Sequence, residues 1–222
     1  MSGDSLSSAA QAGLTYVETE DRRTIAALGF RLTFFRVEDR WSHALAVDGE
    51  SGPAGSEGLV EVVEGDPDRD DRTRVVSPTY QEVQEHAVPE GICLLLTGQS
   101  TPHHFSAVVT ARLEANGVTI EFDVADRCRE PVVTLGAMYL VRLGSSDLID
   151  AGTGRITWEG NALGAGRLEF VADDPASVSL SEAGRRASRV QALARIVPTE
   201  RTQRLLYRWR WSPSAPAVTV ES

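Results

Sequence analysis

Histidine, acid and arginine residues gather at the outer ends of two segments of this sequence. His103 and His104 begin the first segment, and Asp126, Arg127 and Arg129 end the second. An imidazole that titrates near neutrality, a carboxylate and a fixed positive charge are the minimum set for general acid–base chemistry on a polar substrate. The alternative interpretation is structural: Asp126 and Arg127 would form ion pairs at a sheet end, and the histidines would cap a loop.

A β-hairpin would bring these two segments together. Alternating apolar and polar residues lie on both sides of Asn116-Gly117, and Asn-Gly is the strongest short-range signal for a two-residue turn. Such a turn predicts a register in which one face of the hairpin is apolar and the other is charged. The predicted pairs are Leu113–Ile120, Ala111–Phe122 and Val109–Val124 on the apolar face, Arg112–Glu121 and Thr110–Asp123 on the charged face, and Ser106–Arg127 and Ala107–Asp126 towards the open end. The two histidines would then lie roughly 35 Å from the turn, at about 3.3 Å per residue.

A second candidate site is the tetrapeptide Arg40-Trp41-Ser42-His43. An arginine, an indole and an imidazole this close together could stack on a sugar ring and hydrogen-bond it. The alternative interpretation is that Trp41 belongs to the core and His43 is a satisfied neighbour on the same face. The alternating runs 30–34 and 41–47 predict that this tetrapeptide begins the second strand of another hairpin.

The remaining pattern predicts an all-β fold, a large and mainly antiparallel β-sandwich with at most one or two short helices. Alternating runs recur between turn signals every 8–12 residues, which is typical of a sandwich or barrel. We expect a single domain over 14–212, with tails at 1–13 and 213–222.

Ser77-Pro78 is a helix-start signal, so we predict a short helix over 78–86. Residues 21–28 could form a helical turn, and 188–197 suits a helix or a strand, of which we favour the strand.

Charge and cysteine content restrict the classes of function. The 222 residues carry a net charge of -10, and all 22 basic residues are arginine, which excludes chemistry that needs a lysine. An acidic chain is a poor partner for nucleic acid, because affinity for nucleic acid comes from neutralising phosphates. No run of 18 apolar residues predicts a membrane span, and the N-terminus lacks a secretory pattern. With two cysteines only, we expect reduced thiols and a cytoplasmic location.

No motif in the sequence predicts a metal or another cofactor. Asp66, Asp68 and Asp70 have the spacing of a calcium loop, but Asp71 stands where such a loop needs glycine and Ser77 where it needs glutamate. Two adjacent histidines without further close ligands do not predict a zinc site either. We therefore expect a site made only of protein side chains.

The order of the predicted strands resembles one known architecture. Long antiparallel strands, with His103 and His104 entering a strand that returns to Asp126 and Arg127, look like the large β-supersandwich of the galactose-mutarotase-like, carbohydrate-handling proteins. The resemblance covers most of residues 14–212, although the chain is shorter than typical members and shows no further family motif. It implies a sugar or sugar derivative as ligand, a histidine acid and a glutamate base. Those roles would fall to His104 and Glu159.

Two hypotheses of different class follow from these observations. The first is a carbohydrate-binding or mutarotase-like module in which His104, Asp126 and Glu159 are catalytic and the other candidates bind substrate. Those binding candidates are His103, Arg127, Arg129, Arg40, Trp41 and His43. The second hypothesis is a non-enzymatic interaction or scaffold domain that uses its Trp-rich terminal strand or an exposed edge. A polar pocket lined by the histidines would favour the first hypothesis, and a flat face with splayed histidines the second.

Overall fold

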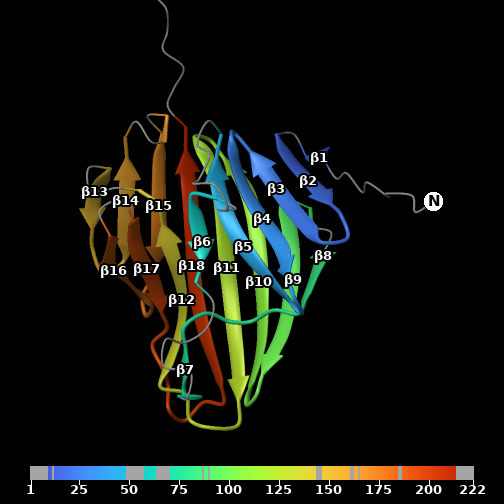
Figure 1. Cartoon of the computed structure of the whole chain (residues 1–222), viewed down its shortest axis with the longest axis vertical. Coiled ribbons are helices and arrows are strands. Elements are labelled where there is room, and N and C mark those ends of the chain that lie inside the picture. Colours follow the sequence, from blue (N-terminus) through green and yellow to red (C-terminus); the bar gives the residue numbers. More distant parts are fainter. Residues whose placement is uncertain are drawn as a thin grey trace, which may run out of the picture.

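The structure is a computed structural model that describes residues 10–11, 13–48, 58–63, 71–86, 88–89, 91–143, 147–160, 163–164, 166–184 and 187–213. These residues form two large sheets that pack face to face as a sandwich, and they contain no helix (Figure 1). The predicted all-β antiparallel sandwich is therefore confirmed.

Within the described residues, ten strands form the first sheet. Their order is β1 (Ala10–Gln11), β2 (Leu14–Glu18), β3 (Arg22–Ala27), β4 (Phe30–Val37), β5 (Arg40–Val47), β6 (Val60–Val62), β12 (Thr134–Val141), β17 (Ala187–Leu193) and β16 (Ser177–Gly184), with β7 (Arg74–Val75) paired in parallel to the start of β12.

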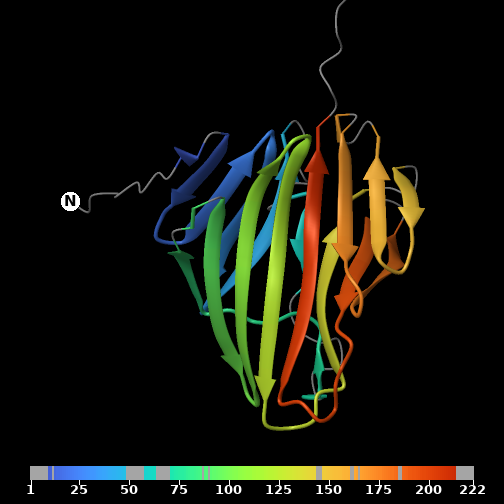
Figure 2. The same ribbon diagram turned by 180° about the vertical axis from the view of Figure 1, so that it is seen from behind.

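The second sheet, counted over the same part of the chain, has eight strands and faces the viewer in Figure 2. Their order is β13 (Leu148–Ala151), β14 (Arg155–Glu159), β15 (Arg167–Ala172), β18 (Thr202–Ser212), β11 (Gly117–Cys128), β10 (His103–Glu114), β9 (Ile92–Ser100) and β8 (Glu82–His86).

The central hairpin of β10 and β11 forms as predicted, but in a register two residues away from the predicted one. Glu114 pairs with Gly117, so the two-residue turn is Ala115-Asn116 rather than Asn116-Gly117. Gly117 has no positive φ; a Cβ on it would lie 2.1 Å from the carbonyl oxygen of Trp211 on β18. The close approach of β18, and not a turn conformation, requires glycine here. The observed pairs are Leu113–Val118, Ala111–Ile120, Val109–Phe122, Ala107–Val124, Thr110–Glu121, Arg112–Thr119 and Ser106–Ala125.

The faces of the strands follow the predicted alternation. On β18 the side chains of Leu205, Tyr207, Trp209 and Trp211 are buried between the sheets, as the alternating pattern predicts. The intervening arginines lie on the outer face and pair with acids across the sheet: Arg204 contacts Asp123 at 2.6 Å and Arg208 contacts Glu121 at 3.7 Å.

Both predicted helical segments are strands or extended chain. Residues 22–27 of the 21–28 segment form β3, and residues 82–86 of the 78–86 segment form β8, which pairs with β9. The Ser77 side chain does not cap a helix, because its oxygen accepts the backbone N–H of Met138 at 2.9 Å. The strand predicted within 188–197 is confirmed as β17.

The outer face of strand β9 is partly exposed, and the strand extends almost to β10. Leu95 is 37% exposed on the outer face. The strand continues to Ser100, so a tight turn joins it to β10.

The lower end of the second sheet is covered by a separate segment. Strands β9 to β11 extend below the first sheet in Figure 1, and residues 71–79, which include β7, cross beneath it to reach them. We call residues 71–79 the strap. One end of the strap is fixed to the loop before β12, since Val133 N–H donates to Thr73 O at 2.8 Å. The other end leads to Tyr80, whose backbone oxygen accepts the Trp41 N–H at 2.8 Å.

Some expectations concern residues outside those described. Asp66, Asp68 and Asp70 lie there, as does most of both predicted tails, although residues 10–11 of the first tail pair with β2. In the part of the chain that the structure describes, nothing forms a helix long and apolar enough to traverse a bilayer.

Candidate functional site

His103 and Asp126 form a buried pair at the lower end of the central hairpin. They lie on the face of β10 and β11 that points between the sheets, and they are 5% and 0% exposed. His103 Nδ1 lies 2.8 Å from Asp126 Oδ2, and His103 Nε2 lies 2.7 Å from the backbone oxygen of Arg72 in the strap. This histidine therefore connects the sheet to the strap.

The two hydrogen bonds of His103 determine how many protons the pair holds. A backbone oxygen only accepts, so Nε2 must carry a proton. If Asp126 is ionised, Nδ1 must carry one as well, which makes His103 an imidazolium. Burial alone would lower the pKa of His103, but the hydrogen bonds to Asp126 and Arg72 and the charges of Asp126 and Glu130 outweigh burial and raise it above the ordinary 6.5. The pair is thus best described as His103⁺ and Asp126⁻.

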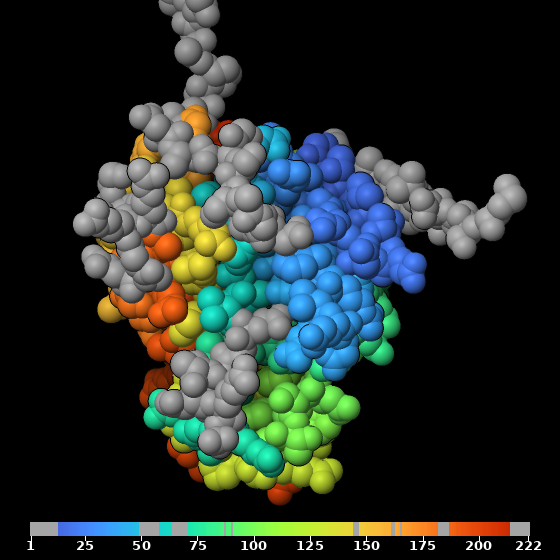
Figure 3. Space-filling view, viewed as in Figure 1, coloured from blue at the N-terminus to red at the C-terminus, as the bar shows by residue number. Residues whose placement is uncertain are grey.

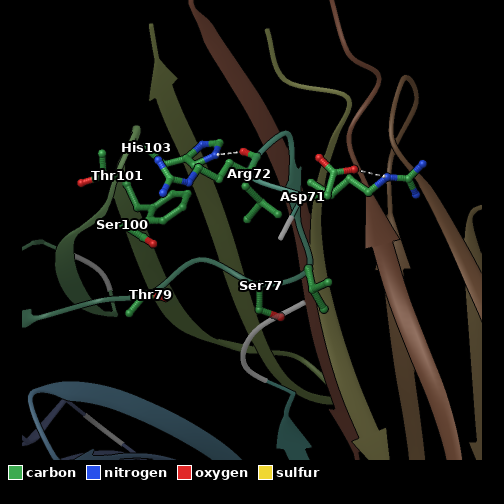
Figure 4. Close-up of a pocket in the computed structure, with 11 residues that line it drawn as sticks. Asp71, Arg72, Ser77, Thr79, Ser100, Thr101 and His103 are labelled. Atoms are coloured by element: carbon green, nitrogen blue, oxygen red, sulfur yellow. Dashed lines mark hydrogen bonds and ion pairs between the residues drawn. The ribbon is translucent and has the colours of Figure 1, made fainter. Parts of the chain in front are cut away.

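A cavity of about 190 Å³ lies between the strap and the ends of β9 and β10. Figure 4 shows Arg72 and Thr101 along its upper rim, with Ser77 and Thr79 along its lower rim. The His103 side chain lines the cavity, and its ring stacks on Phe105 with the ring centroids 5.5 Å apart. The same end of the molecule is seen in Figure 3, where the teal strap lies beside the green surface of β9 and β10.

Hydroxyl groups give this cavity its hydrogen-bonding capacity. Thr79, Ser100 and Thr101 all line it, and none of their hydroxyls is hydrogen-bonded within the described part of the chain. Ser77 is different, because its hydroxyl is occupied by the backbone of Met138. Three hydroxyls are therefore available to a polar ligand.

Other predicted residues at this end lie outside the cavity. His104 and Arg127 pair directly across β10 and β11, and both side chains are exposed on the outer face. Arg129 lines a separate hollow of about 270 Å³ together with Cys128 and Arg201. The structure thus brings His103 and Asp126 together and separates both from His104, Arg127 and Arg129.

Glu159 lies far from every predicted partner. It pairs with Arg167 on β15, which in turn pairs with Ser212 at the upper end of β18. Three strands stand between β14 and β10 in the sheet, and Glu159 is level with the hairpin turn rather than with its open end. At about 3.3 Å per residue, the offset from His104 along the strands is roughly 30 Å. His104 and Glu159 cannot act as an acid–base pair on one substrate.

The second predicted cluster does not form a site either. Trp41 is 5% exposed, and the guanidinium groups of Arg23 and Arg36 lie 5.0 and 5.8 Å from its ring centroid. Arg40 contacts the neighbouring carboxylate of Asp39 at 3.4 Å. Little of the indole surface is left for a sugar ring.

His43 belongs to the core of the sandwich. Its Nε2 hydrogen-bonds the hydroxyl of Tyr139 at 2.9 Å, and that hydroxyl hydrogen-bonds Tyr207 at 2.7 Å. Burial lowers the pKa of His43 to about 3, so this imidazole is neutral near pH 7. The alternative interpretation, a satisfied core histidine, is the one that the geometry supports.

Sequence reasoning missed the residues that give the cavity its polar lining. Ser100 and Thr101 lie three and two residues before His103, so the polar end of that segment was a usable signal. Arg72 and Thr79 had no such signal, because they reach the cavity through contacts of the strap with distant segments, among them the parallel pairing of β7 with β12. Metal ligands are not assembled here: no group of three or more His, Cys, Asp and Glu side chains among the described residues could hold a metal ion.

Comparison with known proteins does not assign this chain to a family. No protein-family model matches this chain, and no curated protein matches it either. The site must therefore be interpreted from its own geometry.

Proposed function

We propose that this protein binds a sugar, and that the site is the cavity between the strap and the ends of β9 and β10. The observation that carries the proposal is a set of hydroxyls around one cavity, on Thr79, Ser100 and Thr101, that form no hydrogen bond with any described residue. A sugar ring presents many hydroxyls that each donate and accept, and serine and threonine hydroxyls can meet them in either role. The preformed strap avoids the cost of ordering a loop on binding.

The volume of the cavity limits the size of the ligand. Cavities for drug-sized ligands measure about 300–1,000 Å³, and this one measures about 190 Å³. A single sugar unit is therefore a better match than an oligosaccharide.

Binding is proposed here rather than epimerisation. A mutarotase needs an acid and a base on one substrate, and His104 and Glu159 lie at opposite ends of the sheet. His103 is beside the cavity, but both of its ring nitrogens are held by Asp126 and by the Arg72 carbonyl. The role that fits His103 is to hold the strap in place.

A second candidate function is protein interaction, and one observation favours it. Leu95 and Val108 pair side by side on the outer face of the second sheet and are 37% and 40% exposed. The terminal strand cannot serve as the docking element, because β18 lies between β11 and β15 and its tryptophans are buried. If this face binds a partner or a second copy, a Leu95→Asp variant should lose that association in light scattering.

Calorimetry and thermal shift against neutral monosaccharides test the proposed function. A sugar at 100 times its Kd should add about 2.7 kcal/mol of stability, which corresponds to a rise in Tm of about 5–11 °C for a domain of this size. The double variant Ser100→Ala, Thr101→Val should lose this rise, because it removes two hydroxyls from the rim. Ser106→Ala, which removes an exposed hydroxyl from the outer face of β10, should keep it. If no monosaccharide binds the wild-type protein, the proposal is wrong.

A further inference from the structure

One guanidinium group at the cavity has no carboxylate partner among the described residues. Arg74 Nε contacts Asp71 Oδ2 at 3.1 Å, and His103 is paired with Asp126. Arg72 forms no ion pair within the part of the chain that the structure describes. Figure 4 shows its side chain running beside His103 towards Thr101, over the cavity.

The backbone that carries this guanidinium is fixed on both sides. The Arg72 oxygen accepts the His103 Nε2–H at 2.7 Å. Next to it, the Thr73 N–H donates to Asp71 Oδ1 at 3.0 Å, and the Thr73 oxygen accepts the Val133 N–H. Because the backbone at Arg72 is already fixed, the arginine loses less conformational freedom when its guanidinium group binds an anion.

The charges that line the cavity are also unbalanced. Among the described residues that line the cavity, Arg72 and Arg74 stand against one carboxylate, Asp71, while the charges of His103 and Asp126 cancel. The described lining thus carries one excess positive charge on a chain whose net charge is -10. A planar guanidinium of this kind binds a carboxylate through two parallel hydrogen bonds.

We propose that the natural ligand of the cavity is an anionic sugar, a sugar acid whose carboxylate is bound by Arg72. The ring hydroxyls then meet the hydroxyls of Thr79, Ser100 and Thr101. This inference rests on the proposed function, and it adds the chemical class of the sugar and the residue that selects it.

Titration calorimetry of the full chain with matched sugars tests the inference. The pairs are D-glucuronate with D-glucose and D-galacturonate with D-galactose, so that each pair differs in one carboxylate. We expect the acid to bind about tenfold more tightly or better, which is the range of a charge-assisted hydrogen bond. The preference should shrink between about 20 mM and about 0.5 M salt, because an exposed guanidinium is screened.

Two variants separate Arg72 from general electrostatics. Arg72→Gln should bind the neutral sugars as before and lose the preference for the acids. Arg127→Gln removes the same charge from the outer face at the same end of the sheet and should keep the preference. Thermal melts test whether both variants fold, which we expect because both side chains are exposed.

Several results would overturn the inference. Equal affinity for the acid and the neutral sugar in the wild-type protein would overturn the role of Arg72 and leave sugar binding intact. A preference that survives in Arg72→Gln would assign the selection to another residue. If the wild-type protein binds neither member of any pair, both this inference and the proposed function are wrong.

Discussion

Replacing His103 and replacing Asp126 should have very different effects on the free energy of unfolding. His103→Ala leaves the Asp126 carboxylate fully buried without a donor, since its Oδ1 already has no hydrogen-bond partner within the described residues. Removing one partner of a buried ion pair costs about 3–5 kcal/mol, which corresponds to a fall in Tm of about 6–20 °C for a domain of this size.

Asp126→Asn should be milder, because a neutral network can replace the charged one. The asparagine NH₂ can donate to His103 Nδ1, and Nε2–H still donates to the Arg72 carbonyl. Both hydrogen bonds of the histidine survive, and no charge is left buried without a partner. We expect the free energy of unfolding at pH 9 to differ from the wild-type value by less than about 1 kcal/mol.

The stability of the wild-type protein and the stability of Asp126→Asn should depend differently on pH. In the wild-type protein the folded pKa of His103 is raised above the ordinary value of 6.5. A raised pKa means that the folded state holds its proton more tightly, so the stabilisation is complete below pH 6.5 and is lost as the pH rises through the folded pKa. Asp126→Asn lacks the carboxylate that holds this proton and should not show this loss.

Urea unfolding at several values between about pH 6 and pH 9 measures the difference directly. The other three histidines are the same in both proteins, so their contributions cancel in the comparison. Asp126→Asn should be less stable than the wild-type protein at pH 6 and should approach or exceed it at pH 9. Parallel profiles for the two proteins would refute the assignment of a charged His103 that links Asp126 to the strap.

Three further predictions test other parts of the structure. His43→Phe should reduce the loss of stability between pH 6.5 and 4.5, because the buried imidazole has its pKa lowered to about 3 and only the unfolded state gains a proton there; acid unfolding measures this. Gly117→Ala should cost about 1–3 kcal/mol in urea unfolding, since its Cβ would lie 2.1 Å from the Trp211 oxygen, whereas Gly152→Ala, with its nearest atom at 3.7 Å, should change little. Glu159→Gln should leave sugar binding unchanged and cost under about 1 kcal/mol, because the ion pair of Glu159 with Arg167 is exposed.

The sequence predicted the faces of the strands better than their ends. Alternation is a property of neighbouring residues, so the buried row of Leu205, Tyr207, Trp209 and Trp211 could be read directly from the sequence. The helix predicted over 78–86 was wrong because its signals are local, whereas the pairing of β8 with β9 and the engagement of Ser77 by Met138 depend on distant segments. The same limit applies to the site. His103 and Asp126 were both candidate residues, the first for substrate binding and the second for catalysis, but the strap that completes the cavity shows no periodicity.

The register of the central hairpin explains why a prediction in the wrong register still placed His103 and Asp126 on the same face and at the same end of the sheet. A shift of two residues keeps every side chain on its face, so His103 and Asp126 point inward in both registers. The predicted register sets Asp126 opposite Ala107, four residues or about 13 Å along the strand from His103. The observed one sets it opposite Phe105, two residues away, and such diagonal neighbours at about 7–8 Å are within reach of each other.

The packing at the far end of the hairpin therefore determines whether the site can form. With Gly117 against the backbone of Trp211, the turn falls at Ala115-Asn116, and the strands are aligned so that Asp126 reaches His103. A chain that instead turned at Asn116-Gly117 would bury the same apolar face, and the core would not distinguish the two registers by face. Only the observed register allows His103 to bond Asp126 and the strap together, so the close approach at Gly117 positions a cavity at the opposite end of the sheet.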